Sequence, residues 1–183
     1  MTSDELKNII QSNTDRIGFK EMLEDRISGL VLEFGVAEGN TIRDISQYCD
    51  KVYGFDSFEG LPEDWRDGMG AGTFKCEVPT VPENVELVIG LIQDTIDGFM
   101  NDHPDDVSFI HIDVDLYSST KCILSKLKDR IKSGTIIAFD ELCLYGGYEE
   151  HEFKAFLEFI NDTGFKIENI GSRHTEARTF RII

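Results

Sequence analysis

The feature that most constrains this sequence is the junction at residues 31–41, where an apolar strand pattern runs into two spaced glycines. Gly35 and Gly39 carry no Cβ, so the backbone can turn tightly there and approach a ligand closely. Asn40 or Thr41 is expected to cap the helix that follows, whose first N–H groups favour a carboxylate or a phosphate. The junction is typical of α/β proteins that bind small ligands. It lacks the three-glycine fingerprint of dinucleotide binders, which disfavours a nicotinamide oxidoreductase.

Strand-like and helix-like apolar patterns alternate along the chain. Strands are expected at 30–36, 52–55, 85–89, 107–112, 135–139, 165–170 and 179–183. Helical patterns occur at 4–28, around 42–45, and at 95–100, 118–131 (capped by Ser118) and about 149–160. Such alternation predicts a doubly wound α/β fold, a mostly parallel sheet with helices on both faces, and the closing pair suggests an antiparallel last strand. The length suits a single domain over 1–183, with short N-terminal helices at 4–28.

Residues 59–83 interrupt this alternation. They hold three of the four prolines, several glycines and the only tryptophan, Trp65. Long loops in compact domains are usually either functional lids or disordered. Trp65 is therefore expected either to cover a substrate or to anchor the loop.

Composition excludes several classes of partner. The chain has 35 acidic and 18 basic residues, a formal net charge of −17, which repels nucleic acids and anionic membranes. No apolar run approaches the roughly 20 residues of a membrane span, and the N-terminus lacks the features of a signal peptide. Cys49, Cys76, Cys122 and Cys143 are scattered. They are typical of reduced thiols, so a cytoplasmic protein is expected.

Polar residues follow the first three predicted strands. Asp56 ends the second strand, 23 positions beyond Glu33, where an acid can accept hydrogen bonds from ribose hydroxyls. Gly90 and Asp94 follow the third strand. Because ligands bind at the carboxyl ends of parallel strands, these positions are candidate binding residues.

Four more carboxylates follow the fourth and fifth strands: Asp113 and Asp115, then Asp140 and Glu141. They are expected to converge at one edge of the sheet, where their mutual repulsion calls for a cation. Either a ligand with positive groups or a Mg²⁺ ion would supply it. The alternative is that these acids have no specific function and are solvated charges at strand ends.

Segments 31–41, 55–62, 111–121 and 134–140 together resemble the class I S-adenosylmethionine-dependent methyltransferases. More narrowly, residues 30–160 resemble the TylF/MycF type, the macrocin O-methyltransferases. The resemblance implies a Rossmann-like sheet of about seven strands and S-adenosylmethionine as cofactor, with Mg²⁺ assisting. The implied reaction is methylation of a hydroxyl on a sugar or another small molecule. Relatives often pair, so a homodimer is an open expectation.

The resemblance also implies roles for individual residues. Cofactor contacts fall on Glu33, Gly35, Gly39, Asn40, Thr41, Asp56, Ser57, Phe58, Gly90, Asp94 and Asp113. Metal ligands fall on Asp113, Asp140 and Glu141. Leu116 stands where catechol enzymes place a lysine, so the proton acceptor is sought among Asp113, Asp115 and a nearby histidine, with Asp115 preferred.

Two alternatives keep the same pocket. One is a metal-independent methyltransferase, and the other is a catalytically inactive cofactor-binding module that acts through a partner. Among the histidines, His111 is expected to be a core residue because it alternates with Ile112 along a strand, whereas His103, His151 and His174 are expected at the surface.

Overall fold

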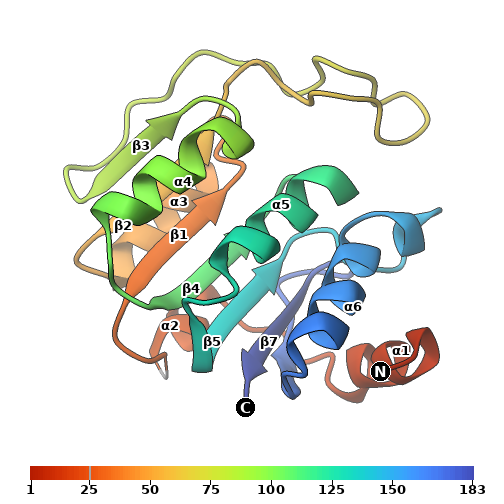
Figure 1. The fold of residues 1–183 in the computed structure, drawn as a ribbon. Helices are drawn as coiled ribbons and strands as arrows, with labels where there is room; N and C mark the ends of the chain where they lie inside the picture. Colours follow the sequence, from red (N-terminus) through yellow and green to blue (C-terminus); the bar gives the residue numbers. More distant parts are fainter. Residues whose placement is uncertain (25) are drawn as a thin grey trace.

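The computed structural model describes residues 1–24 and 26–183 (Figure 1). Within these residues, seven strands form one sheet in the order β3-β2-β1-β4-β5-β7-β6. The strands are β1 (Leu30–Phe34), β2 (Val52–Asp56), β3 (Val85–Ile89), β4 (Val107–Ile112), β5 (Ile131–Phe139), β6 (Ile167–Gly171) and β7 (Arg178–Ile182). Strands β1 to β5 pair in parallel, and β7 lies antiparallel between β5 and β6. The predicted α/β class, with a mostly parallel sheet and an antiparallel last strand, is confirmed.

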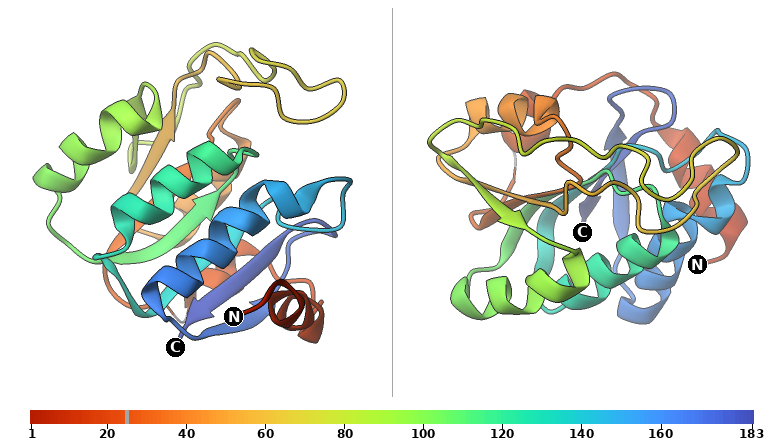
Figure 2. Two further views of the ribbon diagram at one scale, coloured as in Figure 1. Left: turned by 45° about the vertical axis from the view of Figure 1, so that its right-hand side comes forward. Right: turned by 90° about the horizontal axis from the view of Figure 1, so that it is seen from above.

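Helices cover both faces of the sheet (Figures 1 and 2). One face packs against α1 (Ser3–Ser12), α4 (Ile92–Asp102), α5 (Tyr117–Leu127) and α6 (Glu152–Thr163), and the other against α2 (Phe19–Glu24) and α3 (Asn40–Ile45). Short 3-10 turns, η1 (Ser46–Tyr48) and η2 (Tyr148–Glu150), complete the elements. The side chains of β1 alternate accordingly: Leu32 and Phe34 join the first core, and Val31 joins the second. None of the described helices has the length and apolar character needed to cross a membrane.

The order of the strands reverses at the centre of the sheet. The chain moves outward from β1 through β2 to β3, and then returns to place β4 on the other side of β1. Ligands of open α/β sheets bind at such a switch point, beyond the carboxyl ends of the strands. The segment 59–83 passes over this edge, as the view from above in Figure 2 shows, and is called the overlying segment below.

Among the described residues of the predicted helical range 4–28, two short helices, α1 and α2, are separated by an extended link. In the link, Ile17 N–H donates to the Ser172 carbonyl, and Ser172 N–H donates to the Asp15 carbonyl. The side chains of Asn169 and Arg178 donate to the Ile10 carbonyl at the end of α1. Pairing with the β6–β7 region therefore overrides the local helical pattern.

The predicted helix caps are wrong. Gly39, with φ of 79°, is the N-cap of α3, and no side chain caps that helix, so Asn40 and Thr41 lie inside its first turn. Helix α5 begins at Tyr117, and the hydroxyl of Ser118 donates to Glu63 of the overlying segment instead. Glycine can adopt the left-handed conformation at this position, and it leaves the first N–H groups of α3 without a side-chain acceptor.

Candidate functional site

A cavity of about 300 Å³ lies at the carboxyl edge of the sheet. It brings together eight of the predicted site residues: Gly35, Asp56, Ser57, Gly90, Asp113, Asp115, Asp140 and Glu141. The other predicted residues do not line it: Glu33, Gly39, Asn40, Thr41, Phe58 and Asp94. The parallel strands account for the convergence, since their carboxyl ends meet at one edge.

The turn after β1 approaches β4 very closely. Gly35 has φ of 87°, and a Cβ at that position would lie 1.7 Å from the backbone carbonyl oxygen of Asp113. The Asp113 N–H donates to the Phe34 carbonyl at 2.9 Å, which fixes the two strand ends together. Glycine is therefore required at Gly35 by backbone packing as well as by backbone conformation.

Asp56 organises this turn through its carboxylate. One oxygen, Oδ2, accepts from the N–H groups of Val36 and Ala37 at 2.7 and 2.8 Å, and Oδ1 accepts from the N–H of Phe58 at 2.7 Å. Ala37 and Phe58 both lie in the left-handed region, with φ of 45° and 59°. A carboxylate has about four acceptor sites, so roughly one remains for a ligand hydroxyl.

The predicted residues outside the cavity have other surroundings. Phe58 is buried in the core that contains α2 and α3. Gly39 faces Pro79, and Asn40 is exposed near Arg43. Asp94 is exposed in the first turn of α4.

Glu33 contacts a histidine within the sheet. Its Oε1 lies 3.1 Å from Nδ1 of His111, and both side chains are fully buried. Burial alone would lower the pKa of His111, but the carboxylates of Asp140 and Glu33 raise it to about 10. The predicted core position of His111 is confirmed, and Glu33 faces that imidazole.

Asp140 is surrounded by basic side chains. Its Oδ1 lies 3.1 Å from Nε2 of His174, 3.6 Å from Arg173 and 3.7 Å from Nε2 of His111. Burial tends to raise the pKa of Asp140, but His111 and His174 lower it below its usual range. This carboxylate is thus balanced by cations from β4 and the β6–β7 connection.

The other three acids form a cluster without such balance. Asp113, Asp115 and Glu141 each place one carboxylate oxygen within 4.8 Å of the other two, and they are called the acid cluster below. Burial, together with repulsion from Asp140, raises the pKa of Asp113 to about 8 and that of Glu141 to about 9. Burial raises the pKa of Asp115 to about 7, against the opposing effect of Arg66. Among the described atoms, Oε2 of Glu141 is buried without a hydrogen-bond partner.

The acid cluster differs from the predicted metal set in one member. The cluster contains Asp115 in place of the predicted ligand Asp140, because the carboxylate of Asp140 contacts His174. Asp115 adopts a left-handed backbone, with φ of 63°, which is uncommon for a residue with a side chain and is found at functional sites. Three oxygen donors with mutual repulsion, from the buried Asp115 and the half-buried Asp113 and Glu141, suit a hard divalent cation such as Mg²⁺.

Sequence reasoning singled out Trp65 but missed the residues packed around it and an apolar wall of the cavity. An apolar wall of the cavity comes from Phe74, Leu91 and Ile92. A second apolar cluster, called the aromatic cap below, forms from Leu61, Trp65, Met69, Leu116 and Tyr145. Leu116 directly follows Asp115 in the chain. The apolar residues scattered through the polar segment 59–83 were the available signal.

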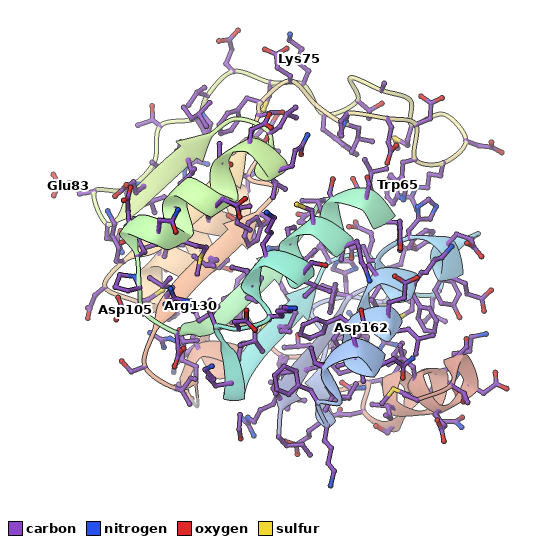
Figure 3. The ribbon with its side chains drawn as sticks, viewed as in Figure 1. Trp65, Lys75, Glu83, Asp105, Arg130 and Asp162 are labelled. Atoms are coloured by element: carbon purple, nitrogen blue, oxygen red, sulfur yellow. The ribbon has the colours of Figure 1, made fainter. Side chains whose placement is uncertain are left out.

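Trp65 joins the overlying segment to the body of the protein (Figure 3). Its ring lies 5.7 Å from that of Tyr145 at an angle of 72°, and its exposed fraction is 6%. The guanidinium of Arg66 stacks 3.8 Å above the Trp65 ring and lies 5.1 Å from that of Tyr145. Figure 3 shows Trp65 and Lys75 at the edge of the sheet that the overlying segment covers, and Asp105 and Arg130 at the opposite edge.

Comparisons with known proteins agree with this geometry. A family model described as a methyltransferase domain matches residues 32–142. The calicheamicin methyltransferase CalS11 superposes with a TM-score of 0.68 and 21% identity, covering 98% of this chain and 76% of that one. The O-methyltransferase NovP superposes with a TM-score of 0.65 and 21% identity, and the match covers 97% of this chain and 78% of that one.

An O-methyltransferase from Bacillus cereus, solved in complex with SAH, gives a TM-score of 0.56 and 12% identity, covering 98% of this chain and 86% of that one. At these identities the structures show a shared fold. No curated protein sequence matches the chain.

Proposed function

Because this chain belongs to the methyltransferase-domain family, we propose that it is an S-adenosylmethionine-dependent O-methyltransferase, assisted by Mg²⁺. The acceptor is a hydroxyl of a sugar or another small molecule. One observation carries the proposal: a single cavity contains both the glycine turn after β1 and the acid cluster after β4 and β5. Cofactor binding alone would not require the second feature.

The donor end of the cavity has the chemistry that S-adenosylmethionine needs. Phe74, Leu91 and Ile92 supply an apolar wall for an adenine ring, and Asp56 supplies an acceptor for a ribose hydroxyl. The turn at Gly35 allows close backbone approach to the methionine portion. The Bacillus cereus neighbour holds SAH on the same fold, which supports this assignment.

The acid cluster fits a divalent cation. Asp113, Asp115 and Glu141 would hold Mg²⁺, which would lower the pKa of an acceptor hydroxyl and orient it. Asp140 lies beside this set with Oδ1 engaged by basic groups, so we place it outside the ligands. Burial first, and then repulsion from neighbouring carboxylates, raise the pKa values of Asp113 and Glu141.

When bound, S-adenosylmethionine would supply an electrophilic methyl group for transfer to the acceptor oxygen, and S-adenosylhomocysteine would be left. The protein must align the oxygen behind the methyl group, and alignment of this kind contributes up to about 7–11 kcal/mol. The cavity walls and the overlying segment provide that alignment.

Asp115 is the proposed general base, which accepts the proton of the acceptor hydroxyl. Its exposed fraction is 5%, and one of its carboxylate oxygens lies within 4.8 Å of those of Asp113 and Glu141, where the acceptor hydroxyl would bind. A carboxylate has two oxygens, so the residue can give one to the cluster and take the proton on the other. Asp115→Asn is expected to abolish turnover, and near-normal turnover would remove Asp115 from this role.

A sugar acceptor is supported by the neighbours. One CalS11 structure carries the description TDP-rhamnose 3′-O-methyltransferase. The segments at 55–62 and 111–121 favour placement within the TylF/MycF type. Both points are proposals for this chain.

Calorimetry with S-adenosylhomocysteine, with NAD⁺ as the competing ligand, tests the donor assignment. We expect saturable binding of S-adenosylhomocysteine and none of NAD⁺, and the opposite result would overturn the proposal. Turnover of S-adenosylmethionine with a panel of nucleotide-linked sugars and catechols then tests the metal. Loss of turnover in EDTA and recovery with Mg²⁺ would support metal assistance, whereas equal rates would favour the metal-independent alternative.

A further inference from the structure

One arginine joins the glycine turn after β1 to the overlying segment. The guanidinium of Arg43, on α3, donates through Nη2 and Nε to the Thr80 carbonyl at 2.8 and 3.3 Å. It donates through Nη1 to the Glu38 carbonyl at 3.0 Å, and the same nitrogen lies 3.5 Å from Oδ1 of Asn40. Because a planar guanidinium holds several acceptors in fixed directions, this side chain ties together two backbones that are distant in the chain.

The two backbones also approach each other beside this guanidinium. A Cβ at Gly39 would lie 3.2 Å from Cγ of Pro79 and 3.4 Å from Cζ of Arg43, so a side chain at position 39 would crowd both. Gly39 does not line the cavity, and its close neighbours give it a different role from the predicted cofactor contact. Without a side chain there, the overlying segment can lie directly against the turn that follows β1.

The part of the overlying segment that Arg43 holds is continuous with the wall of the cavity. Phe74 lines the cavity, although its exposed fraction is 50%. Two residues further on, the Cys76 N–H donates to the Phe58 carbonyl at 3.3 Å. The far end of the overlying segment is held separately, in the aromatic cap. The position of Phe74 therefore depends on the stretch 76–80, which Phe58 fixes at one end and Arg43 at the other.

We propose that Arg43 is a positioning residue for the donor: it fixes residues 76–80 on the glycine turn and so seats Phe74 against the adenine ring. The inference rests on the proposed function, because it assumes that the cavity takes up S-adenosylmethionine. Arg43 itself does not line the cavity, so it acts through the overlying segment. Since coupling between two sites is reciprocal, a bound donor in turn holds this part of the segment in place.

Calorimetry with S-adenosylhomocysteine tests the effect of Arg43 on the donor. Arg43→Gln removes the charge and the bridge between the two backbones, and we expect the Kd to rise about tenfold, the equivalent of one hydrogen bond to a charged group. Arg43→Lys keeps the charge but has no planar fork, so it should recover only part of the affinity. Wild-type affinity in Arg43→Gln would overturn the proposal. Wild-type affinity in Arg43→Lys would assign the effect to charge alone and also overturn it.

Arg130→Gln is the matched control for this measurement. Arg130 is half-buried like Arg43, and its Nη1 donates to a backbone carbonyl, that of Asp105, at 3.4 Å. It lies at the opposite edge of the sheet from the overlying segment (Figure 3). Its loss should leave the affinity for S-adenosylhomocysteine unchanged. A Kd that rises equally in Arg130→Gln and Arg43→Gln would contradict a specific role for Arg43.

Limited digestion with trypsin tests the position of the overlying segment directly. Lys75 follows Phe74 in this segment, and 62% of its side chain is exposed, so cleavage after Lys75 reports how firmly the segment is held (Figure 3). We expect faster cleavage there in Arg43→Gln than in the wild type, and more protection by S-adenosylhomocysteine in the wild type. Equal rates of cleavage after Lys75 would overturn the proposal. Faster cleavage at every site of Arg43→Gln would show a loosened fold and contradict it as well.

Failure of the proposed function gives a different result. Wild-type protein that does not bind S-adenosylhomocysteine would overturn the donor assignment and this inference together. Binding by the wild type with the same affinity in Arg43→Gln would overturn the inference alone. Melting curves and Trp65 fluorescence without ligand establish that each variant is folded with its aromatic cap intact, and if Arg43→Gln unfolds, Arg43→Lys decides the matter.

Discussion

Glu33 and His111 are direct partners in the register of β1 and β4, and their side chains meet at 3.1 Å inside the protein. The pair therefore ties together the two strands at which the order of the sheet reverses. It also connects the core to the cavity, since the other imidazole nitrogen of His111 faces Asp140. Glu33 faces this histidine and does not line the cavity, and its predicted contact with the donor stays a prediction.

The first prediction concerns the pH dependence of stability. The pKa of His111 is raised from about 6.5 to about 10, so the folded protein holds a proton that the unfolded chain releases. This contribution is complete below about pH 6.5 and falls as the pH rises through 10. His111→Gln should cost about 3–5 kcal/mol at pH 6, with the gap to wild type narrowing toward pH 10. Urea unfolding in EDTA measures this, and a gap that stays constant with pH would contradict the assignment.

The second prediction concerns the glycine turn. Gly35→Ala would place a methyl group against the Asp113 carbonyl in a left-handed conformation, so we expect a loss of about 2–5 kcal/mol. Gly98→Ala is the matched control: Gly98 lies exposed inside α4 with open space around it. That change should stabilise by up to about 1 kcal/mol. Equal melting temperatures for the two variants would show that the close approach is unimportant.

The third prediction separates two predicted cofactor residues. Asp56→Asn removes the carboxylate that accepts three backbone hydrogen bonds, so it should cost about 1.5–3 kcal/mol and weaken binding of S-adenosylhomocysteine. Asp94→Asn changes an exposed residue away from the cavity and should do neither. Calorimetry and thermal melting of both proteins give the answer. Identical behaviour of the two variants would refute the role of Asp56.

The fourth prediction concerns the acid cluster. Mg²⁺ that binds only the folded state stabilises it by about 2.7 kcal/mol at 100 times its Kd. Wild-type protein should therefore melt at higher temperature as MgCl₂ is added, and Asp113→Asn should lose that response. Asp50→Asn, an exposed acid next to the amino end of β2, should keep it. A full response in Asp113→Asn would exclude that residue as a ligand.

Local sequence patterns were sufficient to predict the strands of the sheet and several residues at their carboxyl ends. Parallel strands carry their carboxyl ends to one side, so Asp56, Asp113 and Asp140 could be placed together without knowledge of any contact. The long segment 59–83 was also recognisable from its prolines and glycines. The strand pattern likewise showed His111 to be a core residue.

Contacts between segments that are distant in the chain could not be predicted from local sequence patterns. The approach of Arg173 and His174 to Asp140 depends on how the β6–β7 connection folds back, and no local pattern encodes it. The N-cap at Gly39 depends on its left-handed backbone conformation, whereas the polar residues Asn40 and Thr41 favoured a side-chain cap in the sequence. The helical period of 4–28 was interrupted by pairing with Ser172, a residue far along the chain.

The strands at the centre of the sheet, β1 and β4, enclose a long loop of chain that includes the segment 59–83. The entropy of closing such a loop grows only with the logarithm of its length, so even doubling it costs about 0.6 kcal/mol. Insertions or deletions between β2 and β3 therefore cost the scaffold little. Exchange of this stretch would alter the part of the cavity lined by Gly60, Leu61, Pro62 and Phe74, while the turn at Gly35 and the carboxylate of Asp56 stay in place.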